Sequence, residues 1–182
     1  MTPPTTFRPH LTWMDIKMPN ENDRFPVRKN PRLTHYDYTS YNYYFVTICT
    51  YNKQCIFGSP VSLSAIGKIA ADCMAKIPIH FPGISIDKWV IMPNHVHVIV
   101  VLPGNSAALS TIIGQYKAAV TREIRAFDSD MQVWQTSFHD HIIRNQADYE
   151  RIWLYIEVNP ARWMTASMYR KLRNKPTCSA GS

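Results

Sequence analysis

The sequence lacks the features that mark several classes of protein. It contains no apolar run of 18 residues, which argues against a membrane-spanning helix, and no charged-then-apolar leader opens it. Its cysteines form no CxxC pair and no zinc-ribbon spacing, so we expect free thiols in a reducing compartment. Internal repeats and low-complexity tracts are also missing. We therefore expect a soluble cytoplasmic protein with no membrane partner, whose four cysteines are Cys49, Cys55, Cys73 and Cys178.

Acidic side chains are scarce relative to basic ones. Lysine and arginine number 20 against 13 aspartates and glutamates, which gives a net charge of +7 and favours a polyanionic partner, most simply nucleic acid. The hydrophobic share of 46% is that of a globular chain. The length of 182 residues predicts one domain with extensions. We expect a basic arm over 1–35, either disordered or lying on nucleic acid, a folded domain over 36–165 and a basic tail over 166–182.

Hydrophobic periodicity predicts the elements of that domain. The aromatic and β-branched stretch 41–51 is a strand, and 138–144 is a shorter one. Apolar residues at helical spacing predict helices over 62–77, ended by Pro78, and over 107–127, with a buried stripe that includes Tyr116 and Phe127. A third helix follows its N-cap Asn145 and is expected to end near Asn159, because Pro160 disfavours helical geometry in the preceding residue.

Two further strands meet at a tight turn formed by Pro93 and Asn94 within the stretch 89–101. The second strand carries His95 and His97, whose side chains share one face because side chains alternate along a strand. Two neighbouring imidazoles on a rigid strand are a ready pair of metal ligands. The alternative is a pair of hydrogen-bonded core histidines.

The element order is strand, helix, strand, strand, helix, strand, and then an appended helix. This order predicts an α+β, ferredoxin-like (RRM-like) fold, in which helices cover one face of an antiparallel sheet. The open face is where the appended C-terminal helix, which carries Tyr155, is expected to lie within reach of the histidine strand.

The appended helix presents polar groups beside its apolar stripe. Tyr155 and Asn159 are four residues apart and therefore share a face, with Arg151 one turn earlier. Alternatively, Tyr155 packs at the edge of the core and Asn159 caps the helix. The expected core stripe consists of Tyr149, Ile152, Trp153 and Ile156.

The two motifs at 93–98 and 155–160 resemble those of the HUH endonuclease superfamily. Within it, the chain is similar to the single-tyrosine transposases of the REP-associated group. The similarity runs over residues 28–163, and its supporting blocks are 36–38, 44–50, 113–117, 134–135 and 140–145.

The resemblance implies a role for each of these residues. His95 and His97 would hold Mg²⁺ or Mn²⁺, and Asn159 stands where related enzymes have a third ligand, a glutamine in the insertion-sequence transposases. Tyr155 would be the nucleophile and form a 5′-phosphotyrosine link. His141 matches a position that the family also holds, so it is a possible site-lining residue together with Arg151. The implied partner is single-stranded DNA with a hairpin, such as a REP element, and the implied state is a monomer.

Other residues compete for the same roles. Tyr116 belongs to an apolar stripe, so it is more consistent with the core than with the nucleophile, and the second histidine pair, His139 and His141, flanks a carboxylate. Basic residues that could contact DNA are Arg28, Lys29, Arg32, Lys117, Arg122, Arg144 and Arg162.

Two other functions compete with a DNA endonuclease and strand transferase. One is a domesticated, non-catalytic nucleic-acid-binding protein on an RNA-recognition-like sheet, although no aromatic RNP motif is present. The other is a small metal-dependent phosphohydrolase, which a covalent adduct on Tyr155 would exclude.

Overall fold

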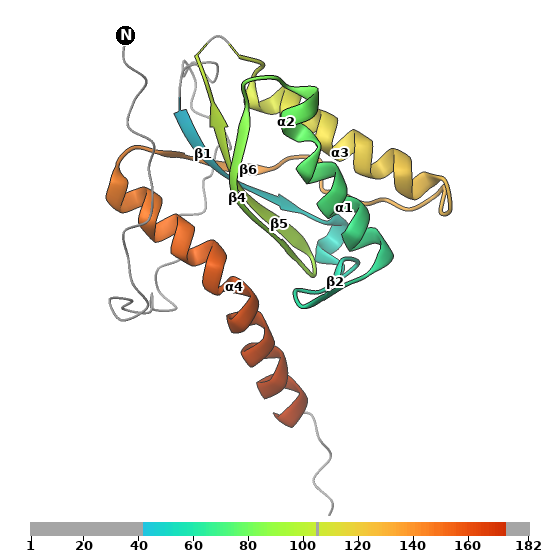
Figure 1. Cartoon of the computed structure of the whole chain (residues 1–182). Helices are drawn as coiled ribbons and strands as arrows, with labels where there is room; N and C mark the ends of the chain where they lie inside the picture. Colours follow the sequence, from blue (N-terminus) through green and yellow to red (C-terminus); the bar gives the residue numbers. More distant parts are fainter. Residues whose placement is uncertain (1–41, 105, 174–182) are drawn as a thin grey trace, which may run out of the picture.

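The computed structural model describes residues 42–104 and 106–173, and these contain one four-stranded antiparallel sheet. The spatial order of its strands is β4-β5-β1-β6 (Figure 1). This order confirms the predicted ferredoxin-like arrangement, with the histidine strand second from one edge. The strands are β1 (Asn42–Cys49), β4 (Ser85–Met92), β5 (His95–Leu102) and β6 (His139–Ile143).

The helices follow the predicted order, with short additions between them. Ser64 caps α1 (Ala65–Ala75), since its hydroxyl accepts a hydrogen bond from the Gly67 amide. Pro78 lies in the first turn of α2 (Ile77–His80), a position where proline is tolerated. A small hairpin, β2 (Gly58–Ser59) with β3 (Ser62–Leu63), precedes α1, and its second strand occupies the start of the range 62–77 that the sequence predicted to be helical. The remaining helices are η1 (Tyr51–Lys53), α3 (Leu109–Arg125) and α4 (Gln146–Arg173).

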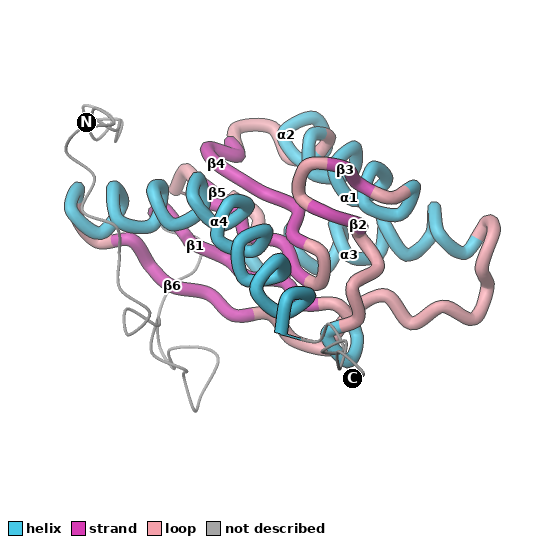
Figure 2. The backbone as a smooth tube through the Cα atoms, turned by 90° about the horizontal axis from the view of Figure 1, so that it is seen from below, coloured by secondary structure: helices cyan, strands magenta, loops and turns pink. Residues whose placement is uncertain are grey.

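The sheet separates two hydrophobic cores. Alternate residues of β1, such as Tyr44 and Val46, pack with α1 and α3 in the larger core. The intervening residues, such as Tyr43 and Phe45, pack with Ile152 and other residues of α4 in the smaller one. Figure 1 shows α4 on the opposite side of the sheet from α1 and α3, and Figure 2 shows it crossing over the strands. The appended helix therefore covers the face on which it was expected.

The predicted end of this helix at Asn159 is wrong, because α4 continues through Pro160 to Arg173. Proline removes one backbone donor and crowds the preceding turn, but it does not forbid a helix. Tertiary contacts hold α4 on both sides of the proline. Tyr149 donates a hydrogen bond to Asp87 before it, and Trp163 packs against His95 after it. The helix also crosses residue 165, where the folded domain was predicted to end.

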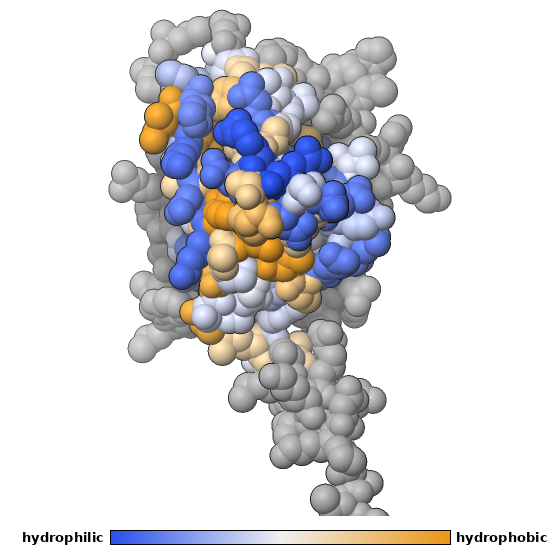
Figure 3. All heavy atoms as spheres, turned by 90° about the vertical axis from the view of Figure 1, so that its right-hand side faces the viewer, coloured by the Kyte–Doolittle hydropathy of each residue, from blue (hydrophilic) through white to orange (hydrophobic). Residues whose placement is uncertain are grey.

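The prediction that Phe127 belongs to the core is also wrong, since this side chain is 60% exposed. α3 ends at Arg125, so Phe127 lies beyond the last turn, and Ile124 is the buried residue instead. The remaining predicted stripe of α3 is buried, including Tyr116. Figure 3 shows hydrophilic and apolar side chains mixed on the side of the molecule that carries α1 and α3.

Three of the four cysteines are free thiols, and Cys178 lies outside the described residues. The predicted arm at 1–35, with Arg28, Lys29 and Arg32, lies outside them as well. Among the helices that the structure describes, none combines the length and the apolar character needed to cross a membrane.

Candidate active site

His95 and His97 lie side by side on β5, on the face that α4 covers. Their ring centroids are 4.5 Å apart. The strand is paired on both sides, with β4 and with β1, so its backbone is held rigidly. His97 is 4% exposed, and Ile99 and Val101 continue the same face into the smaller core. The pair is therefore a fixed feature of the sheet.

In each imidazole, the Nδ1 atom forms a hydrogen bond with a neighbouring side chain. His95 Nδ1 lies 2.7 Å from the Asn94 side-chain oxygen, which can only accept, so the Nδ1 hydrogen donates. The Asn94 amide nitrogen in turn donates to the Lys53 carbonyl at 3.3 Å, which fixes its orientation. His97 Nδ1 is 2.9 Å from the Thr47 hydroxyl, on the neighbouring strand β1. With both Nδ1 atoms engaged, Nε2 is the atom that each ring offers to a ligand.

Burial keeps these imidazoles in their neutral form. It lowers the pKa of His95 to about 4. Burial also holds the pKa of His97 well below its usual value, and the neighbouring His95 lowers it further. A neutral imidazole is the form that binds a metal ion. At neutral pH, both rings are therefore in the state that a metal site requires.

Tyr155 approaches the histidines from α4. Its hydroxyl is 3.4 Å from His97 Nε2, and the two ring centroids are 5.2 Å apart. Phe45 of β1 packs against both rings, with its centroid 5.2 Å from that of His97 and 6.0 Å from that of Tyr155. The helix thus brings a phenol hydroxyl to the atom that His97 offers to ligands.

Asn159 lies one turn after Tyr155 on the same face of α4, and Trp163 follows one turn later. The Trp163 ring packs against His95 at a centroid distance of 6.3 Å, while Tyr155 packs against His97. The helix therefore meets the two histidines one turn before and one turn after Asn159. Asn159 therefore lies on the helix between these two contacts, and its role as a ligand stays a prediction.

Polar contacts with β4 hold α4 in this position. The Tyr149 hydroxyl donates to Asp87 at 2.6 Å. Lys88 pairs with Glu157 and lies over the Trp153 ring, 4.0 Å from its centroid. A bulge between Ile86 and Lys88 breaks the alternation of β4, so two consecutive side chains, Asp87 and Lys88, serve the same helix.

His141 and Arg151, the predicted site-lining residues, meet at Asp148. His141 Nε2 lies 2.7 Å from one carboxylate oxygen, and Arg151 donates to the other at 2.6 Å. Burial acts to raise the pKa of Asp148, but the hydrogen bonds to His141 and Arg151 outweigh it and hold this pKa below its usual value. Asp148 also donates its amide hydrogen to the Asn145 side chain, the predicted cap.

The remaining predicted residues lie elsewhere. Tyr116 is 2% exposed and donates to the Ala70 carbonyl, which confirms the core interpretation. Lys117 and Arg122 lie on α3, on the face of the sheet opposite to α4, and Lys117 donates hydrogen bonds to two backbone carbonyls there. Arg144 is exposed just after β6, and Arg162 is half-buried on α4. Whether any of them contacts DNA stays a prediction.

Sequence reasoning missed four residues that orient the site: Thr47, Asp87, Lys88 and Asn94 in its role as a partner of His95. The sequence alone identifies Asn94 only as a turn residue. The position of Thr47 opposite His97 depends on the register between β1 and β5, and the positions of Asp87 and Lys88 depend on a bulge. Neither register nor bulge leaves a clear signal in one sequence.

The donor set suits a divalent metal ion. Two neutral imidazoles with their second nitrogens hydrogen-bonded match the usual support of metal-binding histidines. Within the described residues, no three His, Cys, Asp or Glu side chains gather to hold a metal. The candidate ligands on β5 and α4 differ from such a cluster, because the third of them is the Asn159 amide.

Comparisons with known proteins are consistent with this geometry. The sequence model of a family described as "Transposase IS200 like" matches residues 37–159. An uncharacterized protein of Haemophilus influenzae is 34% identical over 167 residues, which cover 78% of this chain and 93% of that protein. A REP-associated tyrosine transposase of Escherichia coli K12 is 32% identical over 77 residues, 42% of this chain and 44% of that protein.

A solved structure has the same architecture. It is described as a REP-associated tyrosine transposase bound to a REP hairpin, and it superposes with a TM-score of 0.58 at 25% identity. The match covers 72% of this chain and 73% of that one.

Proposed function

Because this chain belongs to the IS200-like transposase family, we propose that it is a single-strand DNA endonuclease and strand transferase with Tyr155 as its nucleophile. The observation that carries the proposal is the approach of the Tyr155 hydroxyl to His97 Nε2, at 3.4 Å, beside a second imidazole. Packing alone would not require a second buried imidazole beside the His97 nitrogen that the Tyr155 hydroxyl approaches.

The proposed reaction exchanges one ester for another. The Tyr155 oxygen loses its proton and attacks the phosphorus of a phosphodiester, forming an O–P bond while the bond to the 3′ oxygen breaks. That oxygen takes up a proton and becomes a free 3′ hydroxyl, and the 5′ side stays linked to the tyrosine. No water is consumed, so the linkage retains the energy of the diester and the strand can be rejoined.

The residues that would hold the metal are His95 and His97 through Nε2, with Asn159 as the third ligand. A bound Mg²⁺ or Mn²⁺ supplies Lewis-acid stabilisation of negative charge on the phosphate oxygens. Thr47 and Asn94 hold the two imidazoles in orientation through their Nδ1 atoms. Phe45 and Trp163 pack against the rings and limit their rotation.

We propose single-stranded DNA that contains a hairpin as the substrate. The support is the similarity to a REP-associated transposase whose structure was solved with a REP hairpin, together with the net charge of +7. Repeats that flank the gene are the first sequences to test. A monomer is the proposed state, which light scattering of the DNA-free protein checks directly.

The test is covalent trapping. End-labelled hairpin oligonucleotides from the flanking repeats are incubated with the protein and Mn²⁺ or Mg²⁺ and run on a denaturing protein gel. The native protein should yield a shifted, labelled band that is lost in Tyr155→Phe and His95→Ala. Tyr51→Phe is the matched control and should retain the band. Tyr51 is a tyrosine of η1, so its replacement removes a hydroxyl group from neither α4 nor β5.

The outcomes separate the competing functions. Adduct formation by Tyr155→Phe would reject the assigned nucleophile. DNA binding without adduct or cleavage under every metal and substrate tried would favour the non-catalytic binder. Cleavage without a covalent species would favour a phosphohydrolase.

A further inference from the structure

The site around the histidines is closed along the strand in one direction and open in the other. From Ile99 onward, the same face of β5 is covered by the smaller core, which includes Val101 and Tyr43. His97 is 4% exposed, whereas His95, the first residue of β5, is only half-buried. A DNA strand whose phosphate lies at the histidines would therefore leave the site on the side of His95 and not over Ile99.

Trp163 lies at this open end. It follows Tyr155 by about two turns of α4, and its ring meets His95 at a centroid distance of 6.3 Å and an interplanar angle of 61°. The contact is of the edge type and the side chain is only half-buried, so part of the indole stays accessible. An accessible indole is a surface on which an unpaired base can stack.

The turn η1 lies beside the same end of the site, because the Asn94 side chain bonds both His95 and the Lys53 carbonyl. Asn52 and Lys53 have φ angles of 49° and 56°, in the left-handed region that residues other than glycine rarely adopt. The Lys53 amide donates to the Thr50 carbonyl at 3.1 Å, which closes the turn. Such strain persists only where the surrounding structure fixes it, and it is frequent at ligand sites.

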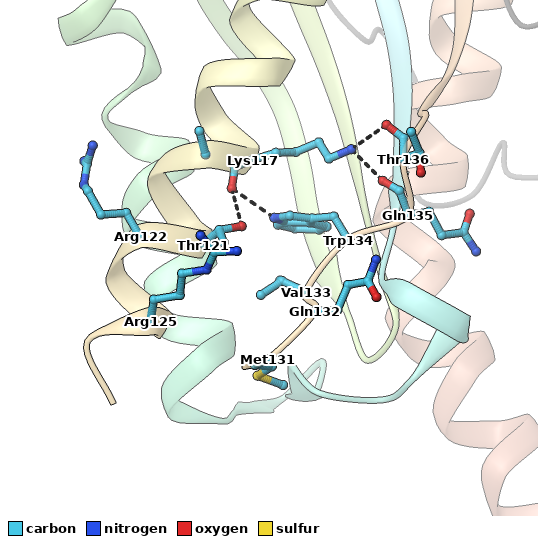
Figure 4. Close-up of a pocket in the computed structure, with 11 residues that line it drawn as sticks. Lys117, Thr121, Arg122, Arg125, Met131, Gln132, Val133, Trp134, Gln135 and Thr136 are labelled. Atoms are coloured by element: carbon cyan, nitrogen blue, oxygen red, sulfur yellow. Dashed lines mark hydrogen bonds between the residues drawn. The ribbon is translucent and has the colours of Figure 1, made fainter. Parts of the chain in front are cut away.

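The turn is anchored to a segment that α3 holds in place. The Tyr51 amide donates to the Val133 carbonyl at 2.9 Å. Figure 4 shows that the segment containing Val133 is tied to α3 through Lys117, whose ammonium donates to the Gln135 carbonyl at 2.6 Å. The backbone of the strained turn is therefore supported from the opposite face of the sheet.

The Lys53 side chain brings a positive charge to the open end of the site. It is exposed, and among the residues that the structure describes no carboxylate pairs with it. Burial raises the pKa of the Cys49 thiol, and the Lys53 ammonium is close enough to act against this rise. Cys49 is paired with His95 across the two strands, so it shares the face that carries the histidines. The ammonium is thus within reach of a strand that passes His95.

We propose that Trp163 and Lys53 form a subsite for one unpaired nucleotide next to the cleaved bond, with its base stacked on the indole and its phosphate paired with the ammonium. The inference rests on the proposed function, because it places a neighbour of the cleaved phosphate. A base inside a duplex has both faces covered by its neighbours, so the subsite selects an unpaired nucleotide at this position.

The test measures binding without chemistry. Fluorescein-labelled hairpin oligonucleotides from the flanking repeats are titrated with the whole protein in EDTA, where the proposed metal-dependent cleavage cannot occur, and fluorescence anisotropy gives the affinity. In a series of these oligonucleotides, one nucleotide of the single-stranded flank at a time lacks its base. We expect Trp163→Ala to bind the intact oligonucleotide about tenfold more weakly. At one abasic position, next to the cleaved bond, the native and Trp163→Ala proteins should bind equally.

A second variant tests the charge. Lys53→Gln should reduce the slope of log K against log salt by about 0.7, the value for one phosphate contact with single-stranded DNA. Lys53→Arg keeps the charge and should restore the slope. A neutral methylphosphonate at the same nucleotide should remove the difference between the native and Lys53→Gln proteins. A difference that survives methylphosphonates at every linkage of the flank would exclude the phosphate contact.

Trp89→Ala is the matched control. Trp89 is 36% exposed, but it is paired with Val98 of the larger core and so lies on the opposite face of the sheet. This variant should bind every oligonucleotide as the native protein does. Trp163→Phe keeps an aromatic ring and should retain most of the affinity. If Trp163→Ala only loosened α4, it would weaken binding to all abasic oligonucleotides equally, and that result would overturn the proposal.

Covalent trapping separates this proposal from the proposed function. A native protein that forms the Tyr155 adduct, combined with equal losses for Trp163→Ala at every abasic position, would keep the function and reject the subsite. A loss confined to one position in a protein that never forms an adduct would reject the function. The subsite would then stand as part of a non-catalytic DNA-binding protein.

Discussion

The Tyr155 hydroxyl lies 3.4 Å from His97 Nε2, the atom through which His97 would bind a metal ion. One lone pair cannot serve both a hydroxyl donor and a metal. Metal binding at Nε2 and this hydrogen bond would therefore exclude each other, so the tyrosine would have to release His97 if a metal ion bound there. The proposed nucleophile thus lies beside the proposed metal site and is not one of its proposed ligands.

This relationship predicts that Tyr155→Phe separates metal binding from catalysis. We expect the variant to bind Mn²⁺ at least as tightly as the native protein, because a competitor for His97 Nε2 is removed, while the covalent adduct is lost. Electron paramagnetic resonance of free Mn²⁺ during a titration measures the affinity. A tenfold loss of Mn²⁺ affinity in Tyr155→Phe would contradict the arrangement.

Thr47 should matter for the metal without touching it. Its hydroxyl bonds His97 Nδ1 at 2.9 Å, and loss of such a supporting hydrogen bond typically lowers metal affinity by about 10- to 100-fold. We therefore expect Thr47→Val to weaken Mn²⁺ binding by a factor in that range. Thr47→Ser keeps the hydroxyl and serves as the matched control. Equal affinities of the Val and Ser variants would exclude a supporting role.

The buried histidines predict acid sensitivity of the fold. In the unfolded chain, a histidine binds a proton below pH 6.5, whereas burial lowers the pKa of His95 to about 4 in the folded protein. The unfolded state therefore binds more protons between these values, and the free energy of unfolding must fall as the pH falls from 6.5 to 4. The full effect of His95 is about 3 kcal/mol.

Urea unfolding at a series of pH values, without added metal, measures this effect. His95→Gln removes one titrating group, so its stability should fall less steeply over the same interval. The pKa of Asp148 is lowered in the folded protein, which adds a loss of stability at the acid end in both proteins. Parallel pH profiles for the native and His95→Gln proteins would show that His95 is not held neutral by the fold.

The sheet could be predicted from the sequence because each strand carries its own signal. The Pro93–Asn94 turn and the alternation that follows locate His95 and His97 on one face, and β5 confirms both. The partner of His97 could not be predicted in this way. Thr47 is 50 residues away, and only the register of β1 against β5 brings it opposite the ring.

The course of α4 shows a different limit. Local preference at Pro160 predicts a helix end, and contacts with the sheet override it. Tyr149, Glu157 and Trp163 bond or pack with residues of β4 and β5, on both sides of the proline. These contacts join residues that are distant in sequence. Helix propensity depends on local sequence alone, so it cannot predict them.

Replacement of Pro160 tests whether this proline, inside α4, lowers the stability of the folded protein. Pro160→Ala restores a backbone donor for the preceding turn and relieves the clash of the ring with the Ile156 carbonyl. We expect the free energy of unfolding to rise by about 1–3 kcal/mol, since proline in a helix interior is about 3 kcal/mol worse than alanine. Thermal and urea unfolding measure the gain.

Pro82→Ala is the control for this experiment, because Pro82 is exposed and lies outside the helices. There, replacement only gives the unfolded chain more freedom, and stability should fall by less than about 1 kcal/mol. If Pro160→Ala behaves like this control, the proline is not strained in α4. If it stabilises the protein but weakens Mn²⁺ binding, the proline instead sets the angle at which Asn159 and Trp163 meet the histidines.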